Sequence, residues 1–502
     1  MPTHKNAGQL PAEKKIYQLI ISRLDGERIR EAFYREKILG LVKRGIGGFI
    51  LFGGWKEEVK SFIRDLQASA EVPLFIASDV ERGICQQIQG TTPLPCQMAV
   101  SAAVDVSRPD DVFLLRESLR VLAEEAGDMG INMPLIPVLD VNRDPDNPII
   151  CTRAFSDDPE RVAWFGSEYI RILERAGLIT SAKHFPGHGD TSTDSHIRLP
   201  VIRKSREDLM DTDIAPFREA IRTGAGSIMV GHLSIPSIDA NPASLSGKIL
   251  TDLLRNELGF EGLILTDALI MSALNDIANV PARCIEAGAD ILLHPADPDA
   301  TAKELLAAVA AEGRLRQKTE AAYARIAAIK TRLHDAAGRE VDYRKNMEIS
   351  AQIVQKSISL VQGTIGEVPA ADKRRLHLVL AGDPELYALS SVRKYFPRIS
   401  TIDEEISLEN RCPVFAVFTS VAAWKGSSGI SDAEKEKILR LIQQAGCSVV
   451  ISFGSPYVLR HFRDARVLIA AYEATEQAQD AVMKCLEGRS EFSGIVPVDL
   501  GL

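Results

Sequence analysis

Short runs of apolar residues alternate with longer amphipathic segments over residues 15–335. The runs are almost continuously hydrophobic, which is typical of strands buried on both faces of a parallel sheet. Eight such runs occur, at 19–24, 48–52, 73–79, 135–140, 179–184, 227–232, 263–267 and 290–294. Eight strands that alternate with helices predict an α/β fold, a (β/α)8 TIM-like barrel.

The segments between the runs carry helix signals. The stretch 205–224 opens with Ser205 and Asp208, spaced as a capping pair, and stops at Gly224. Pro159 stands at the first position of a helix that we expect to stop at Gly177. Two further helices are predicted, over 304–333 and 344–362.

The pattern changes near residue 335. Four more apolar runs follow, at 376–381, 413–418, 447–453 and 466–472, and helical stretches at 431–445 and 473–487 lie between or after them. This alternation predicts a smaller three-layer α/β/α domain with a mainly parallel sheet. We therefore expect two domains, 1–340 for the barrel and 341–502 for the C-terminal domain, which offers no catalytic constellation of its own.

Composition narrows the function classes. The 502 residues include 59 Lys and Arg against 68 Asp and Glu, a net charge of −9, which argues against a nucleic-acid partner. The seven cysteines are scattered without CxxC pairs, so neither a disulfide framework nor a zinc ribbon is expected. Neither a secretory signal nor an apolar run long enough for a bilayer is found. We expect a cytoplasmic protein without a membrane partner.

Polar residues end six of the eight predicted strands. They are Asp79, Asp140, His184, His232, Asp267 and His294. Barrel enzymes build their active sites at the carboxyl ends of the strands. The sequence therefore predicts an active site at this edge.

The densest chemistry lies in 183–196, which holds three of the nine histidines and starts at a strand end. Its Pro and Gly residues favour a loop. One interpretation is a metal site, whose ligands would be His184, His188, Asp190, Asp194 and His196. A second is proton transfer by an Asp194–His196 pair, since a carboxylate beside an imidazole stabilises its charged form. A third is a solvated loop that only shapes a turn.

The stretch 183–189, followed by Asp194-Ser195-His196, resembles the signature of glycoside hydrolase family 3 and, more narrowly, of its β-N-acetylglucosaminidase branch. Further blocks resemble that family in the same order, at 142–148, 153–155, 229–232, 242–246, 265–271 and 286–290. The resemblance covers residues 10–335, and the remaining chain resembles the second domain of longer members.

The resemblance implies a retaining exo-β-glycosidase without metal or cofactor that releases N-acetylglucosamine from a small carbohydrate, with cell-wall muropeptides as its substrates. Asp267 would be the nucleophile, and His196 the acid/base with Asp194 as its partner. The sugar-binding residues would be Asp79, Arg153, Lys183 and His184. We expect a monomer or homodimer.

One stretch departs from the family pattern. After Asp79 the branch usually has two arginines, and this chain has Ile84 and Gln87 at those positions. Neither replaces the planar donor fork of Arg. A β-glucosidase and a sugar-binding relative without activity therefore remain alternatives, and the histidine-rich loop keeps a metal-dependent hydrolase open. A phosphorylase is another, because a neutral imidazole base repels an incoming phosphate less than a carboxylate would.

Overall fold

The structure is a computed structural model, and it describes residues 10–191, 199–333, 341–369, 372–408, 411–421 and 425–502. Contacts divide the chain into two compact units. The first comprises residues 1–94, 119–141 and 159–346, and the second comprises 95–118, 142–158 and 347–502. Two segments, 95–118 and 142–158, thus group with the C-terminal part of the chain. The domain boundary at residue 340 stays a prediction.

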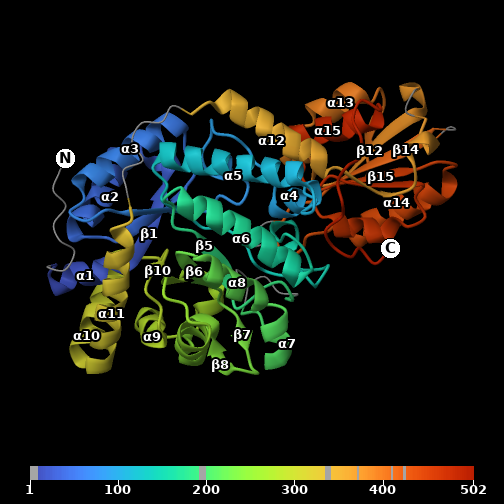
Figure 1. The fold of residues 1–502 in the computed structure, drawn as a ribbon. Coiled ribbons are helices and arrows are strands. Elements are labelled where there is room, and N and C mark those ends of the chain that lie inside the picture. Colours follow the sequence, from blue (N-terminus) through green and yellow to red (C-terminus); the bar gives the residue numbers. More distant parts are fainter. Residues whose placement is uncertain (1–9, 192–198, 334–340, 370–371, 409–410, 422–424) are drawn as a thin grey trace. The chain divides into compact units, whose positions relative to one another are not determined.

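The described residues of the first unit form a barrel of eight parallel strands (Figure 1). They are β1 (Ile20–Asp25), β2 (Gly48–Phe52), β3 (Phe75–Ser78), β4 (Met133–Pro134), β5 (Ser181–Phe185), β6 (Ser227–Val230), β9 (Leu263–Thr266) and β10 (Leu292–Leu293). Hydrogen bonds join them in the orders β10-β1-β2-β3-β4 and β5-β6-β9. Parallel bridges Val138–Lys183 and Leu265–Ile291 connect the two sheets and close the ring. The predicted barrel is confirmed, and each strand falls within or beside its predicted run.

Helices and short connecting elements follow these strands in the first unit. The helices are α1 (Ala12–Gln18), α2 (Ala32–Arg44), α3 (Lys56–Ser69), α6 (Pro159–Arg175), α7 (Arg206–Asp211), α8 (Ala215–Thr223), the π-helix η6 (Lys248–Glu257), α9 (Val280–Ala287), α10 (Pro298–Ala311) and α11 (Gly313–Lys330). Helix α5 (Pro109–Met129) contributes residues to both units. An antiparallel hairpin of β7 (Ser234–Ile235) and β8 (Asp239–Pro242) follows β6.

Three predicted helices are wrong in extent. The stretch 205–224 forms two helices, α7 and α8, because Pro216 lacks an amide hydrogen and begins a new helix. The stretch 304–333 lies in α10 and α11, which are separated at Glu312, where the backbone is extended. The helix predicted over 344–362 ends earlier, and the chain continues as a strand from Ser359. The Ser205 cap is confirmed, since its hydroxyl accepts from the Asp208 amide at 3.0 Å.

The second unit contains a six-stranded sheet in the order β11-β16-β15-β14-β12-β13. The strands are β11 (Ser359–Gln362), β12 (Leu376–Gly382), β13 (Ile399–Thr401), β14 (Cys412–Phe418), β15 (Val449–Phe453) and β16 (Val467–Ala470), and only β11 pairs in the antiparallel sense. The helices are α4 (Gln97–Ala103), α13 (Ser390–Tyr395), α14 (Asp432–Gln444) and α15 (Glu476–Leu486), together with α12 (Tyr343–Ser357), whose first residues belong to the first unit. The predicted mainly parallel sheet is confirmed.

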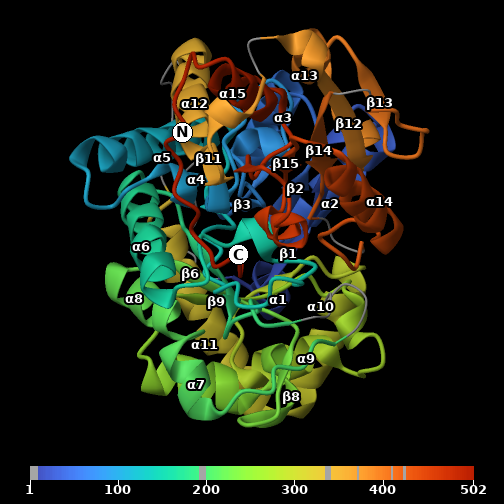
Figure 2. The same ribbon diagram turned by 90° about the vertical axis from the view of Figure 1, so that its right-hand side faces the viewer.

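Alternate residues of this sheet enter two separate hydrophobic cores. On β12, Leu378 and Leu380 join the core that α13 and α15 cover, whereas Val379 and Ala381 join the core that α14 covers (Figure 2). Successive side chains of a strand point to opposite faces, so this division requires helices on both faces. The predicted three-layer arrangement follows.

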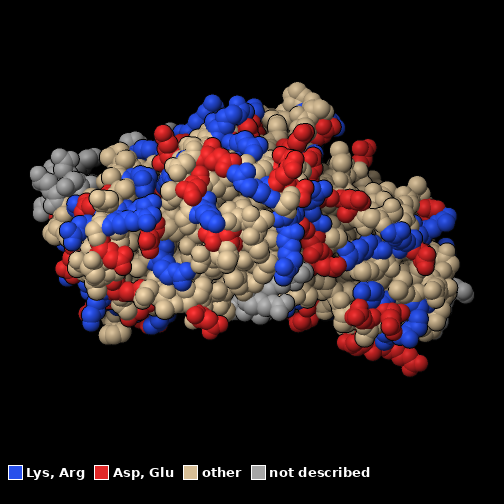
Figure 3. Space-filling model, turned by 90° about the horizontal axis from the view of Figure 1, so that it is seen from below, with Lys and Arg blue, Asp and Glu red and all other residues tan. Residues whose placement is uncertain are grey.

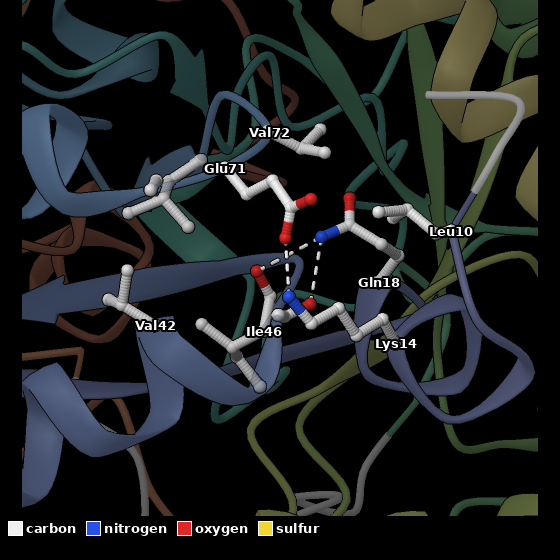
Figure 4. A pocket seen from close by; sticks show the side chains of 10 residues that line it. Leu10, Lys14, Gln18, Val42, Ile46, Glu71 and Val72 are labelled. Atoms are coloured by element: carbon white, nitrogen blue, oxygen red, sulfur yellow. Dashed lines mark hydrogen bonds and ion pairs between the residues drawn. The ribbon is translucent and has the colours of Figure 1, made fainter. Parts of the chain in front are cut away.

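The amino-terminal end of the barrel is closed by polar contacts around a small pocket (Figure 4). Gln18, before β1, donates from Nε2 to the Gly45 and Ile46 carbonyls at 2.8 and 3.3 Å. Lys330, at the end of α11, is 3% exposed and donates to Gln18 Oε1 at 2.8 Å and to the Gly47 carbonyl at 2.7 Å. This end carries structural contacts, and the predicted site lies at the opposite end of the strands.

The surface carries mixed charge. On the face in Figure 3, Lys and Arg lie interspersed with Asp and Glu. Within the described residues, no helix has both the length and the apolar character that a membrane crossing requires.

Candidate active site

Lys183 and Asp79 form an ion pair at the carboxyl end of the barrel strands. Lys183 lies on β5, and its ammonium group is 2.7 Å from Asp79 Oδ1 and 2.8 Å from Glu81 Oε1. The Lys183 side chain is 2% exposed, whereas the Asp79 side chain is 29% exposed. Two carboxylates stabilise the buried ammonium charge, and the ammonium fixes Asp79 in a position where its carboxylate can accept hydrogen bonds from sugar hydroxyls.

Glu81 is a partner that the sequence did not assign to the site. It is nearly buried and adds a second carboxylate to the single ammonium charge of Lys183. The signal lies in the spacing, because Asp79 and Glu81 are two residues apart after a strand. The lysine that joins them is more than 100 residues away, so the sequence alone does not reveal the contact.

His184 is oriented by Asp140, a strand-end carboxylate to which the family resemblance gave no role. Its Nδ1 lies 2.6 Å from Oδ2 of Asp140, which is fully buried. Asp140 Oδ1 accepts from the His188 amide at 2.7 Å and from the His184 amide at 3.3 Å. Burial alone would raise the pKa of Asp140, but the charge and hydrogen bond of His184, with His188, hold it below its ordinary value. The ionised carboxylate fixes the proton on Nδ1 of His184 and turns its Nε2 away from Asp140.

The loop after β5 packs closely against its neighbours as far as residue 191. A Cβ on Gly189 would lie 1.9 Å from the Val141 carbonyl oxygen, and one on Gly187, whose φ is +131°, would lie 2.6 Å from Asp213 Cβ. Both positions therefore require glycine. Lys204 bridges Asp190 and the buried Asp213, at 3.2 and 2.7 Å. These contacts anchor the loop where it leaves the strand.

Asp267 directly follows β9 and is half-buried. Its amide donates to the Val230 carbonyl at 2.9 Å, and its Oδ1 accepts from the Ala268 amide at 2.7 Å. His232, at the end of β6 and fully buried, contacts the Ala268 carbonyl through Nε2 at 3.2 Å and Ser244 Oγ through Nδ1 at 2.8 Å. The neighbouring strand therefore supports the turn that presents the Asp267 carboxylate.

A family comparison identifies this constellation. Residues 12–329 match the glycosyl hydrolase family 3 N-terminal domain. The chain belongs to glycosyl hydrolase family 3. The resemblance seen in the sequence is thereby confirmed, and the protein is a glycosidase that acts on a carbohydrate.

Named relatives extend this result. Beta-hexosaminidase A from Pseudoalteromonas piscicida is 30% identical over 395 residues, which cover 71% of this chain and 66% of that protein. A protein from Cellulomonas fimi named beta-N-acetylglucosaminidase/beta-glucosidase is 26% identical and covers 92% of this chain and 90% of its own. The solved structure of a family 3 beta-N-acetylglucosaminidase from Paenibacillus sp. str. FPU-7 has a TM-score of 0.84 at 28% identity, covering 98% and 99% of the two chains. The architecture described above is that of the family.

Three predicted site residues of this family 3 enzyme, Asp194, His196 and Arg153, are not part of the contacts described above. Asp194 and His196 lie outside the described residues, so their roles stay predictions. Arg153 belongs to the second unit, where its guanidinium donates to the Ile149 carbonyl at 2.9 Å. Its sugar-binding role also stays a prediction.

The metal interpretation is left without support among its described members. His184 contacts Asp140, His188 contacts Thr191 at 2.9 Å, and Asp190 contacts Lys204. Within the described part of the chain, no group of three or more His, Cys, Asp or Glu side chains is arranged to hold a metal ion.

The two positions where the family pattern has arginine make structural contacts. Ile84 is 1% exposed. Gln87 Oε1 accepts from the Gly53 amide at 3.4 Å. Neither residue carries a guanidinium.

Proposed function

We propose that this family 3 enzyme is a β-N-acetylglucosaminidase that removes terminal N-acetylglucosamine from β-linked substrates with retention of configuration. The observation that carries the proposal is the position of Asp267, directly after β9, at the same edge of the barrel as the Asp79–Lys183 and Asp140–His184 pairs. The choice of N-acetylglucosamine as the sugar follows from the names of the hexosaminidase relatives.

The proposed reaction has two displacements at the anomeric carbon. Asp267 forms a bond to this carbon while the bond to the leaving oxygen breaks, and His196, stabilised by Asp194, protonates that oxygen. His196 then takes a proton from water, whose oxygen attacks the same carbon and releases Asp267. Asp79, Lys183 and His184 hold the sugar hydroxyls during both steps.

Finer assignments belong to the same proposal. We infer that muropeptide fragments of the cell wall are the natural substrates and that the enzyme acts in the cytoplasm. A family 3 member that carries its acid/base in the barrel would leave the second unit a structural or dimer-forming role.

Replacement of the nucleophile tests the assignment. Asp267→Ala should lower kcat on an aryl β-N-acetylglucosaminide by at least about 10⁴-fold, because no covalent intermediate can form. A fluorinated glycoside that traps the intermediate should label Asp267 of the wild type, as read by peptide mass spectrometry. A label on another residue, or turnover retained in Asp267→Ala, would contradict the proposal.

A substrate panel separates the alternatives. Aryl N-acetylglucosaminide and aryl glucoside are compared with and without phosphate, and after exhaustive chelation of metals. Preferred turnover of the N-acetylglucosaminide, unchanged by phosphate or chelation, is expected. Preference for the glucoside, release of a sugar phosphate, loss after chelation, or binding without turnover would each favour one of the other functions.

A further inference from the structure

Because Ile84 and Gln87 carry no guanidinium, such a donor beside Asp79 has to come from other positions of the chain. Three side chains to which the family resemblance gave no role meet on the neighbouring strands. They are Arg23 on β1, Phe52 at the end of β2 and His294 directly after β10. These strands lie side by side with β3 in the order β10-β1-β2-β3.

Strand register places Arg23 on the same face of the sheet as Asp79. Arg23 pairs with Ile50 and Ile50 pairs with Ala77, so the side chains of these three residues share one face. Alternation along each strand carries the same face on to Phe52 and Asp79. Asp79 meets Lys183 there, which identifies the face as the one that the candidate site uses.

Phe52 contacts both Arg23 and His294. The Arg23 guanidinium carbon lies 4.9 Å from the centre of the Phe52 ring, and the rings of Phe52 and His294 are 5.6 Å apart. Arg23 is 49% exposed, and among the described residues its polar side-chain partner is Asp25, through a single contact of 3.3 Å. Most of its five N–H donors thus remain available to a ligand.

His294 is the less ordinary member. It is 6% exposed, and its ring nitrogens have no hydrogen-bond partner among the described residues. Its φ of +48° is a left-handed conformation that a non-glycine residue rarely adopts, and such strain gathers at functional sites. Burial, aided by the charge of Arg23 and opposed by that of Asp79, lowers the His294 pKa to about 4. A neutral imidazole has one donor and one acceptor, as a sugar hydroxyl requires.

We propose that Arg23, Phe52 and His294 form the wall of the sugar pocket beside Asp79 and recognise the terminal sugar in place of the two missing arginines. Arg23 donates to a sugar hydroxyl, Phe52 packs against the apolar C–H groups of the ring, and His294 exchanges a hydrogen bond with a neighbouring hydroxyl. This inference rests on the proposed function, because it assigns the terminal sugar to this pocket.

Arg23→Met retains the length of the side chain and removes its donors. Its kcat/KM on the aryl β-N-acetylglucosaminide should fall about tenfold or more, mostly through KM. Arg30→Met is the matched control, since Arg30 is 74% exposed and pairs with Glu58 on the surface. His294→Asn accepts the left-handed backbone and should also raise KM, with an unchanged unfolding midpoint.

The 3-, 4- and 6-deoxy analogues of the substrate identify the hydroxyl. If Arg23 contacts one hydroxyl, Arg23→Met should not lower kcat/KM any further on the analogue that lacks this hydroxyl. Equal losses on all analogues, or an effect confined to substrates with an anionic aglycone, would overturn the inference.

Calorimetric binding of free N-acetylglucosamine and glucose separates this inference from the proposed function. Arg23→Met and His294→Asn should weaken binding about tenfold, and Arg30→Met should match the wild type. Unchanged affinity and KM in both variants would overturn this inference alone. Turnover retained in Asp267→Ala would overturn only the proposed mechanism, and a wild type that neither binds nor turns over these sugars would overturn both.

Discussion

Asp140 shows how one buried side chain organises the carboxyl end of the barrel. It has no direct place in the proposed chemistry, yet it accepts from the imidazole of His184, from the His184 amide in β5 and from the His188 amide in the loop after β5. The sequence places Asp140 at a strand end, but the partners come from the next strand, about 40 residues later. A pairing of this kind depends on the closure of the barrel, which local patterns do not encode.

Asp140→Asn tests this positioning role. An amide keeps the shape and loses the charge, so we expect KM to rise about tenfold and the free energy of unfolding at pH 7 to fall by about 2 kcal/mol. The Asp140 pKa is lowered on folding, so its contribution is present above the ordinary pKa of 3.8 and is lost as the pH falls through the lower folded value. The difference in the free energy of unfolding between wild type and variant, measured by urea denaturation, should therefore shrink from pH 7 to pH 3. A difference that stays constant, with unchanged KM, would refute the positioning role.

At the level of elements, strands were predicted better than helices. A strand buried on both faces is a short, almost continuous apolar run, and the eight runs found the eight barrel strands. Helix limits depend on single residues instead, and the break at Glu312 is marked by the following Gly313, which the Ala-rich pattern around it outweighed. Strands β11 and β13 were missed because they are short and lie at or beside the sheet edge, where partly exposed residues weaken the apolar signal. In the candidate site, the residues at strand ends could be predicted from the sequence, whereas the contacts of Glu81 and His294 depend on how the strands align in the folded sheet.

Lys330 is the last residue of helix α11 and lies at the amino-terminal end of the barrel strands. Its burial leads to a testable prediction. Burial holds its pKa well below 10.5, and Lys330 Nζ lies 4.6 Å from the centre of the Phe75 ring as well as bonding Gln18 and Gly47. Between the folded and unfolded pKa values the unfolded chain binds the extra proton, so wild-type stability should rise with pH towards 10.5.

Lys330→Met removes that proton linkage and leaves buried oxygens without this donor. Urea denaturation from pH 6 to pH 10 measures the free energy of unfolding. We expect that of the variant to lack this rise, so that the difference in favour of the wild type grows by roughly 1–3 kcal/mol over this pH range. Lys303→Met, at an exposed position of α10, is the control and should follow the wild type. Parallel pH curves for Lys330→Met and the wild type would show that the buried amine keeps its ordinary pKa.

At the scale of the whole molecule, the chain passes between the two units at five places, near residues 94, 118, 141, 158 and 346. Segments of the barrel half thereby complete a core of the second unit, since Met98, Ala99 and Cys151 pack in one cluster with Phe415 and Val450 of its sheet. Apolar periodicity identifies strands and helices, but it does not tell which core a connecting segment enters.

A chain truncated after residue 340 tests whether residues 1–340 are stable without this core. Removal of 341–502 would expose Met98, Ala99 and Cys151, each at most 1% exposed in the intact protein, and would leave the segments 95–118 and 142–158 without their core. We expect the fragment to aggregate or to unfold at least about 10 °C below the full chain, because large contiguous apolar surfaces destabilise isolated domains. Thermal unfolding followed by circular dichroism, with the full chain as control, measures the difference. A soluble fragment with the midpoint of the full chain would instead establish 1–340 as an independent domain, and the two inserted segments would then contribute little to the stability of the barrel.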